Sequence, residues 1–106
     1  MQLSEYQTKV ESFDIVPEGR TQAYALLNLA GEVGELTSIQ AKALRDSPEN
    51  TISSEAFVKE LGDVLFMVAY TAYAYGLSLE DVANTNIEKL TSRKERNTLK
   101  GSGDDR

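Results

Sequence analysis

Two long runs of apolar residues at helical spacing, joined by a short polar segment, constrain the fold of this chain more than any other feature. The first run extends from Thr21 to Arg45 and the second from about Ser53 to Tyr75, and in both the apolar side chains recur every three or four residues. Residues 46–53 are polar and contain Pro48, so we expect a turn there. Two long helices joined by a short turn should lie antiparallel.

Shorter helices are expected on both sides of this pair. Ser4 and Gln7 have the spacing of a capping box, which predicts a first helix that continues to about residue 13. Residues 14–20 include a proline and a glycine and should form a loop. Ser78 is a candidate N-cap for a fourth helix that ends near residues 94–96. Since no segment shows a convincing strand pattern, the predicted fold class is all-α, an antiparallel helical bundle of about four helices.

The length of 106 residues allows one compact domain, because domains usually contain roughly 100 to 150 residues. We assign residues 1–100 to this single domain and interpret residues 101–106, which read Gly-Ser-Gly-Asp-Asp-Arg, as a flexible C-terminal tail. A domain this small buries a modest share of its surface. Association with further copies of the same chain is therefore expected to complete the core.

The composition restricts the kind of metal site that the chain can build. With no cysteine and no histidine, thiolate and imidazole ligands are excluded, and so is a disulfide framework. Only oxygen ligands remain. These favour hard cations such as Mg²⁺, Mn²⁺ or Ca²⁺ over zinc or copper.

The charge is acidic overall and unevenly distributed. The formal net charge is −6, with −8 on residues 1–86 and +2 on residues 87–106. The total argues against stable nucleic-acid binding, whereas the short basic part suits a small polyanion or, more simply, is a solvated helix end. The start of the chain lacks the pattern of a signal peptide, and no stretch of about 18 apolar residues occurs. We therefore expect a cytoplasmic protein without a membrane segment.

Two acidic pairs, Glu32 with Glu35 and Glu60 with Asp63, are the candidate functional residues. Within each pair the residues are three apart, so on a helix both carboxylates lie on one side, about 5 to 6 Å apart at their Cβ atoms. Apolar residues share these helix faces, which predicts partial burial. Ionised carboxylates at a helix interface are unfavourable unless a cation compensates their charge. We interpret the four acids as metal ligands, with four solvated acids as the alternative.

Gly31 and Gly34 lie beside the first acidic pair, in the interior of the predicted helix. A glycine in a helix interior costs about 1 kcal/mol relative to alanine. Close approach of another backbone or of a ligand would explain why two glycines are placed there.

A family resemblance adds to this interpretation. Residues 31–36, GEVGEL, and residues 60–65, ELGDVL, resemble the E-x-x-E and E-x-x-D signature of the MazG-like, all-α nucleoside triphosphate pyrophosphohydrolases. Asn86, Lys89 and Arg93 resemble the N-x-x-K segment and a following basic residue of that family's last helix. The resemblance covers about residues 3–93. The end of the chain is similar to that of phage-encoded members, which indicates a viral or bacterial source.

The resemblance implies that water hydrolyses a nucleoside or deoxynucleoside triphosphate between its α and β phosphates, which releases the monophosphate and pyrophosphate. It also implies Mg²⁺ as the cofactor, for which Mn²⁺ can substitute, and a homodimer or homotetramer as the assembly. One of the acids would also orient or deprotonate the attacking water. The residues that would serve both as catalytic groups and as metal ligands are Glu32, Glu35, Glu60 and Asp63.

Substrate contacts are expected from two further regions. Lys89 and Arg93 are four apart, so one helix face would present two cations to phosphate oxygens. Arg96 belongs to the basic strip that follows, which by composition is most simply part of a flexible terminus. The alternative is that this strip folds over the bound phosphates, or over those of a neighbouring subunit. Asn86 would contact sugar, phosphate or metal. Near the start of the chain, Tyr6 could stack on the base and Gln7 could read its edge, with a core position for Tyr6 as the alternative.

Other functions remain open from the sequence. Within the same superfamily, a dUTPase or a phosphoribosyl-ATP pyrophosphatase would share the acidic pairs, and no residue selects between them. A different class of protein is a non-catalytic helical module whose acidic face binds Ca²⁺ or a basic partner. That module would not turn over any nucleotide, and its phosphate binding would not depend on Lys89.

Overall fold

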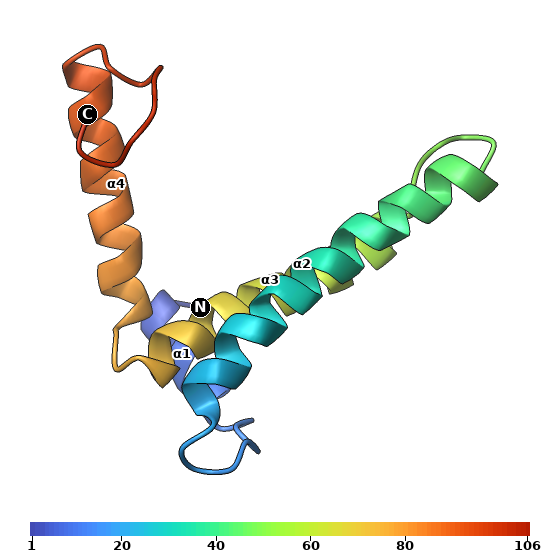
Figure 1. Ribbon diagram of the computed structural model, residues 1–106, viewed down its shortest axis with the longest axis horizontal. Coiled ribbons are helices and arrows are strands. Elements are labelled where there is room, and N and C mark those ends of the chain that lie inside the picture. The colour runs from blue at the N-terminus through green and yellow to red at the C-terminus, as the bar shows by residue number, and fades with distance from the viewer.

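The computed structural model describes all residues from 1 to 106 and contains four helices and no strand, which confirms the all-α fold class. Figure 1 shows two long helices, α2 and α3, that form an antiparallel hairpin, with α1 and α4 near its open end, opposite the turn that joins α2 to α3. The helices are α1 (Leu3–Glu11), α2 (Thr21–Asp46), α3 (Ser54–Ala74) and α4 (Leu79–Glu95). None of them is long and apolar enough to cross a membrane.

Local signals set the helix boundaries at three of the expected places. The hydroxyl oxygens of Ser53 and Ser78 accept hydrogen bonds from the backbone N–H groups of Ala56 and Asp81, so both serines are N-caps. Gly76 adopts φ +71° just after α3, a left-handed conformation that suits glycine and ends the helix. The N-cap that the sequence predicted at Ser78 is therefore confirmed.

The expected capping box at the start of α1 is wrong. The N-cap is Gln2, it makes no side-chain cap hydrogen bond, and Gln7 turns away from the helix start. The Gln7 amide donates to the carbonyl oxygen of Leu77 over 2.8 Å and accepts from the backbone N–H of Leu79 over 2.9 Å. Gln7 therefore ties α1 to the elbow, which we define as residues 75–78 between α3 and α4.

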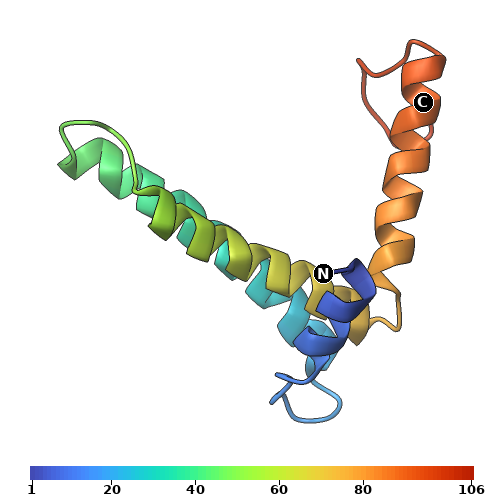
Figure 2. The ribbon, with the colours of Figure 1, turned by 180° about the vertical axis from the view of Figure 1, so that it is seen from behind.

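The molecule is much more open than a closed bundle. Its radius of gyration is 16.9 Å, whereas a compact chain of this length would have about 13 Å. Helix α4 contacts α1 and α3 but not α2, and both Figure 1 and Figure 2 show it leaving the hairpin at the elbow as a separate arm. The sequence predicted that α4 would pack on the two long helices. The Gln7 contacts and the short elbow direct it outward instead.

The core is correspondingly small and lies where α1 crosses the hairpin. Its largest fully buried side chains are Tyr70 and Met67 of α3. Asp14, in the loop after α1, accepts hydrogen bonds from the hydroxyls of Tyr70 (2.8 Å) and Tyr73 (2.9 Å). These contacts fasten the loop to α3, and burial together with Asp14 raises the pKa of Tyr70. The rest of the hairpin has no third helix beside it.

Candidate functional site

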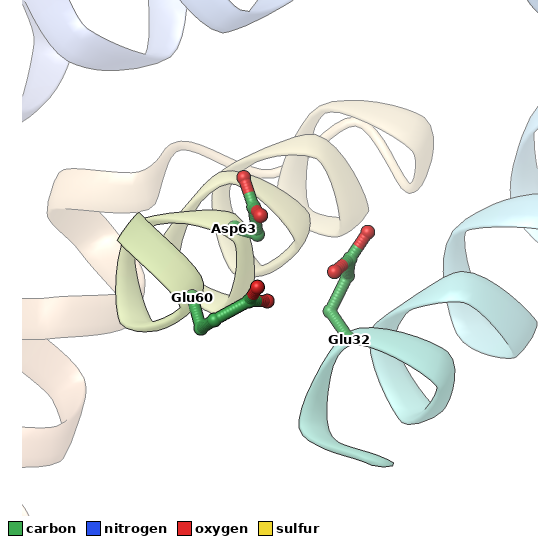
Figure 3. A group of neighbouring side chains, drawn as sticks. All are labelled: Glu32, Glu60 and Asp63. Carbon is green, nitrogen blue, oxygen red and sulfur yellow. The ribbon is translucent and has the colours of Figure 1, made fainter. Parts of the chain in front are cut away.

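Three carboxylates meet in the middle of the hairpin. Glu32 comes from α2 and Glu60 and Asp63 from α3, and each offers one oxygen such that all three oxygens lie within 4.8 Å of one another. Figure 3 shows the three side chains pointing into the space between the two helices. We call these three residues the acid cluster. Their meeting follows from the antiparallel register of α2 on α3, since each residue lies on the face that its helix turns to the other.

Two oxygens of the acid cluster are buried without a partner. Oε2 of Glu32 and Oε2 of Glu60 are inaccessible to solvent, and neither accepts a hydrogen bond. Burial raises the pKa of the Glu32 carboxyl, and the charges of Glu35, Asp63 and Glu60 raise it further. No cation of the chain forms a salt bridge with these acids. The negative charge of the acid cluster is therefore not compensated by any cation of the chain.

The partial burial expected for the four acids holds for two of them. Glu32 and Glu60 are half-buried, whereas Glu35 and Asp63 are exposed. Glu35 is not one of the three acids that meet, although it is close enough to act on the Glu32 carboxyl. A hard cation at the acid cluster would find oxygen ligands only, which fits Mg²⁺, Mn²⁺ or Ca²⁺.

No packing within the chain explains the two helical glycines. A Cβ atom on Gly31 would meet Asn28 at an ordinary distance of 3.5 Å, and one on Gly34 would meet nothing within 4 Å. Both residues are exposed. The close backbone approach that the sequence suggested is therefore absent within one chain, and approach by a ligand or a second copy is left as the explanation.

The two residues expected to contact the base differ in their availability. Gln7 is buried and both ends of its amide are used at the elbow, so its edge is not free to read a base. Tyr6 is half-buried against the core, and its pKa is raised by burial and by the charge of Asp63. Tyr6 therefore packs against the core within range of the Asp63 charge, whereas Gln7 has a structural position.

Asn28 is a residue near the acid cluster that sequence reasoning missed. It lies one helical turn before Glu32, and its amide nitrogen donates to the hydroxyl of Tyr24 and to Sδ of Met67, each over 3.3 Å. Met67 in turn lies one turn after Asp63 on α3. The signal that would have found it is its spacing of four from Glu32, which places both side chains on the same helix face.

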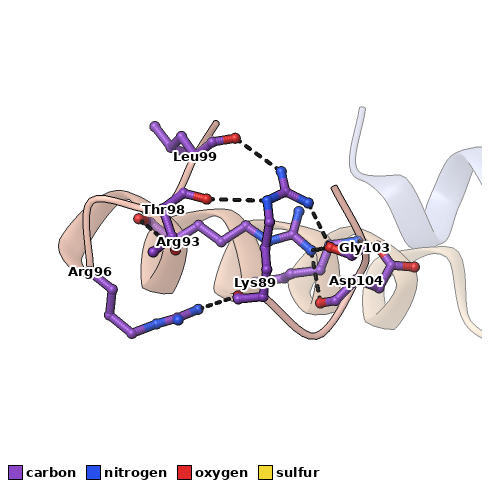
Figure 4. A network of polar contacts seen from close by, with 8 residues as sticks. Lys89, Arg93, Arg96, Thr98, Leu99, Gly103 and Asp104 are labelled. Carbon is purple, nitrogen blue, oxygen red and sulfur yellow. Dashed lines mark hydrogen bonds and ion pairs between the residues drawn. The ribbon is translucent and has the colours of Figure 1, made fainter. Parts of the chain in front are cut away.

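The basic residues expected to bind phosphate lie on the other arm, near the end of α4. Figure 4 shows that residues 97–106 fold back over them, and we call this segment the C-terminal strap. Nζ of Lys89 is 3.1 Å from a carboxylate oxygen of Asp104. The Arg93 guanidinium donates to the carbonyl oxygens of Gly103 (3.1 Å) and Asp104 (2.8 Å), and only 5% of Arg93 is exposed. Arg96 donates to the carbonyl oxygen of Arg106 over 2.8 Å.

The predicted site residues thus fall into two groups that one chain does not bring together. The acid cluster lies on the hairpin, whereas Lys89, Arg93 and Arg96 occupy the last part of an arm that does not touch α2. Asn86 is exposed on the same arm, one turn before Lys89. The flexibility assigned to residues 101–106 stays a prediction, since the structure shows a folded arrangement and not its motion.

Comparison with known proteins adds independent information. The family described as MazG nucleotide pyrophosphohydrolase domain matches residues 20–98. The chain is 39% identical over 89 residues to the Gene 37 protein of Mycobacterium phage L5, which covers 79% of this chain and 75% of that protein. It is 42% identical over 74 residues to the Uncharacterized protein YvdC of Bacillus subtilis (strain 168), which covers 63% of this chain and 70% of the relative. No solved structure matches this chain.

Proposed function

Because the chain belongs to the MazG nucleotide pyrophosphohydrolase domain family, we propose that it hydrolyses nucleoside or deoxynucleoside triphosphates to the monophosphate and pyrophosphate in the presence of Mg²⁺. One observation carries the proposal: two acids of the cluster each hold a buried oxygen that has no partner in the chain. Buried carboxylate oxygens normally have partners. A divalent cation would supply the missing one.

The donor set fits this cation. Glu32, Glu60 and Asp63 offer oxygens within 4.8 Å of one another, and Glu35 is near enough to act on the Glu32 carboxyl. When bound, Mg²⁺ or Mn²⁺ would supply positive charge that offsets the triphosphate and the charge that develops during displacement. Ca²⁺ shares the preference for oxygen but tolerates looser geometry, which makes it a useful comparison.

The carboxylates of the chain have two tasks in this reaction. Those that face one another across the hairpin hold the cation, and one acid accepts a proton from the water that attacks phosphorus. A proton acceptor must keep a free oxygen within hydrogen-bond reach of that water. The phosphorus–oxygen bond to the leaving pyrophosphate then breaks, and cations that pair with its oxygens stabilise the charge.

We assign the pyrophosphate contacts to Lys89 and Arg93 and propose that a second copy of the chain completes the site. The acid cluster and these bases lie on different arms of one chain, so an α4 from a partner would bring cations to the acids. Mixing Glu35→Gln protein with Lys89→Ala protein tests this arrangement. Activity in the mixture above that of either variant alone supports sites built from two chains, whereas no gain after the two proteins are mixed and refolded contradicts it.

Exposed apolar residues support a homo-oligomer. Two apolar hollows share Val68: one lies in the angle between the hairpin and α4, and the other runs along α3. The α3 strip, with Leu61 and Leu65, lies on a different side of α3 from Glu60 and Asp63, so a partner could cover it without covering the acids. Leu65→Glu is expected to shift the protein toward monomer in sedimentation experiments, and an unchanged oligomer would place the interface elsewhere.

The activity itself is tested by product analysis. Purified protein is incubated with each NTP and dNTP and Mg²⁺, and the products are separated by chromatography. Monophosphate with pyrophosphate supports the proposal, whereas diphosphate with orthophosphate contradicts it. No turnover with any nucleotide, together with Ca²⁺ binding at the acids, would instead favour a non-catalytic helical module. We propose a cytoplasmic location for this activity, because its substrates would be free nucleotides.

A further inference from the structure

We propose that the C-terminal strap, residues 97–106, covers the phosphate-binding cations of α4 and that the phosphates of an incoming nucleotide displace it. The strap places the Asp104 carboxylate 3.1 Å from Nζ of Lys89 and 3.5 Å from a guanidinium nitrogen of Arg93. Both distances lie within the limit of about 4 Å for an ion pair, so one carboxylate is paired with two cations. The inference rests on the proposed function, because it concerns the same substrate and the same basic residues.

Burial of Arg93 is the first argument. The side chain is only 6% exposed, and the acceptors of its hydrogen bonds are carbonyl oxygens of the strap. An arginine in this state cannot reach a nucleotide in solution. If Arg93 binds phosphate, the strap must first move away from it.

A buried donor without a partner is the second argument. Nε of Arg93 is inaccessible to solvent and has no hydrogen-bond acceptor, although the terminal nitrogen of the same guanidinium has two. An unpaired buried N–H is costly, and more so on a charged group. The strap therefore satisfies Arg93 incompletely, whereas a phosphate group offers several acceptor oxygens in the plane of the guanidinium.

The strap is built as a defined turn and does not simply trail from α4. Asn97, Gly101 and Gly103 have φ values of +59°, +121° and +88°, which only glycine and asparagine adopt readily. Arg106 closes the turn by donating to the carbonyl oxygens of Thr98 and Leu99. A Cβ atom on Gly101 would lie 3.2 Å from Cδ of Arg106, so this glycine lets the closing side chain pass.

The contact with Asp104 is nevertheless weak enough to be exchanged. Lys89 is about one-third exposed and Asp104 is 84% exposed at its side chain, so solvent screens their attraction. Lys89 lowers the pKa of the Asp104 carboxyl, which keeps it ionised at neutral pH. A triphosphate carries more negative charge than one carboxylate and can therefore replace it at both cations.

Direct observation of the strap tests the proposal without any need for catalysis. The ¹⁵N-labelled full chain is titrated with sodium tripolyphosphate in the absence of metal, at constant ionic strength set with NaCl, and the backbone amides of Gly101 and Gly103 are followed by NMR. We expect their heteronuclear NOE values to fall as the strap is displaced. Asp104→Asn should reach the midpoint at a tripolyphosphate concentration about 1.5- to fivefold lower, which corresponds to one exposed ion pair.

Asp105→Asn is the matched control, because it removes the same charge one residue away and Asp105 makes no ion pair or hydrogen bond through its side chain. Glycine amides that remain ordered at saturating tripolyphosphate would overturn the proposal. So would equal midpoints for the Asp104 and Asp105 variants, since the effect would then reflect net charge alone. Gly101→Ala, which strains the turn at φ +121°, should behave like Asp104→Asn.

Kinetics separate this inference from the proposed function. If the enzyme hydrolyses nucleotides, Asp104→Asn should lower KM by about 1.5- to fivefold and leave kcat unchanged, while Asp105→Asn leaves both unchanged. Unchanged KM with normal turnover overturns the strap and leaves the function standing. Absence of turnover in the unmodified protein overturns the function, and the NMR titration still decides the strap.

Discussion

The hairpin arm, α2 with α3, and the α4 arm differ in how their charges are balanced. On the hairpin, three carboxylates meet and no salt bridge compensates them. On α4, the strap supplies Asp104 to Lys89 and Arg93, so those cations are neutralised within the chain. One arm therefore requires a cation from outside, and the other already holds an anion.

The two halves of the proposed site are therefore prepared in opposite ways for their ligands. Repulsion among buried acids is relieved when a metal ion binds, so the free energy of binding includes that relief. The bases must instead exchange one anion for another. Loss of a carboxylate should therefore lower the activity more than loss of a base.

The largest effect is expected from the acids. Asp63→Asn and Glu35→Gln should each lower kcat/KM by about 10³-fold, since each removes a charged oxygen from the group that holds the cation. Lys89→Gln should cost less, because Arg93 remains. Steady-state assays of pyrophosphate release measure these rates, with Glu18→Gln, an exposed acid in the loop before α2, as the control. Wild-type rates in either acid variant would remove that residue from the site.

Bound metal should raise the free energy of unfolding through the acids of the hairpin arm, and residues of the α4 arm should not affect this gain. Mg²⁺ at about 100 times its dissociation constant should raise the free energy of unfolding by about 2.7 kcal/mol, because it binds only the folded acids. Urea titrations with MgCl₂ and with NaCl of equal ionic strength measure the difference. Glu60→Gln should reduce the gain, whereas Asp104→Asn, on the other arm, should leave it intact. Equal stabilisation by NaCl would mean that screening alone acts on the acids.

The joint between the arms depends on Gln7. Gln7→Ala leaves the carbonyl of Leu77 and the buried N–H of Leu79 without partners, and we expect a loss of about 1–3 kcal/mol in the free energy of unfolding. Gln2→Ala, at an exposed position before α1, is the control. Small-angle scattering should also show a changed radius of gyration for the Gln7 variant. If both variants match the wild type, the elbow is held by other contacts.

The smallest effect expected is a pH dependence that belongs to the hairpin. The pKa of Glu32 is raised in the folded chain, so the folded state binds this proton more tightly than the unfolded state does. Without metal, this contribution of Glu32 to the free energy of unfolding is fully present at pH values below the ordinary glutamate pKa. It is lost as the pH rises through the raised pKa of the folded state. Thermal unfolding between pH 4 and 7 should show this fall, and Glu32→Gln should flatten it. A Glu32→Gln profile identical to that of the wild type would contradict the shift.

Secondary structure was predictable because its signals are local. Ser53, Ser78 and Gly76 act within a few residues of their own positions, so residue types and spacing alone locate the ends of α3 and the start of α4. Gln7 shows the limit of such reasoning. Its spacing from Ser4 predicted a capping box. Its amide instead forms two hydrogen bonds with the backbone of residues that lie 70 and 72 positions further along the chain.

Residue types and their spacing limit the chemistry available to this protein to oxygen ligands, acids three apart on two helices, and bases near the C-terminus. Tertiary structure decided which of these groups meet. The register of α2 on α3 brings Glu32 to Glu60 and Asp63 and leaves Glu35 at the side. A backbone turn through positive φ values places Asp104 on Lys89 and buries Arg93. Spacing along one helix fixes neighbours within it, whereas contacts between elements depend on register and turn geometry, which no single segment encodes.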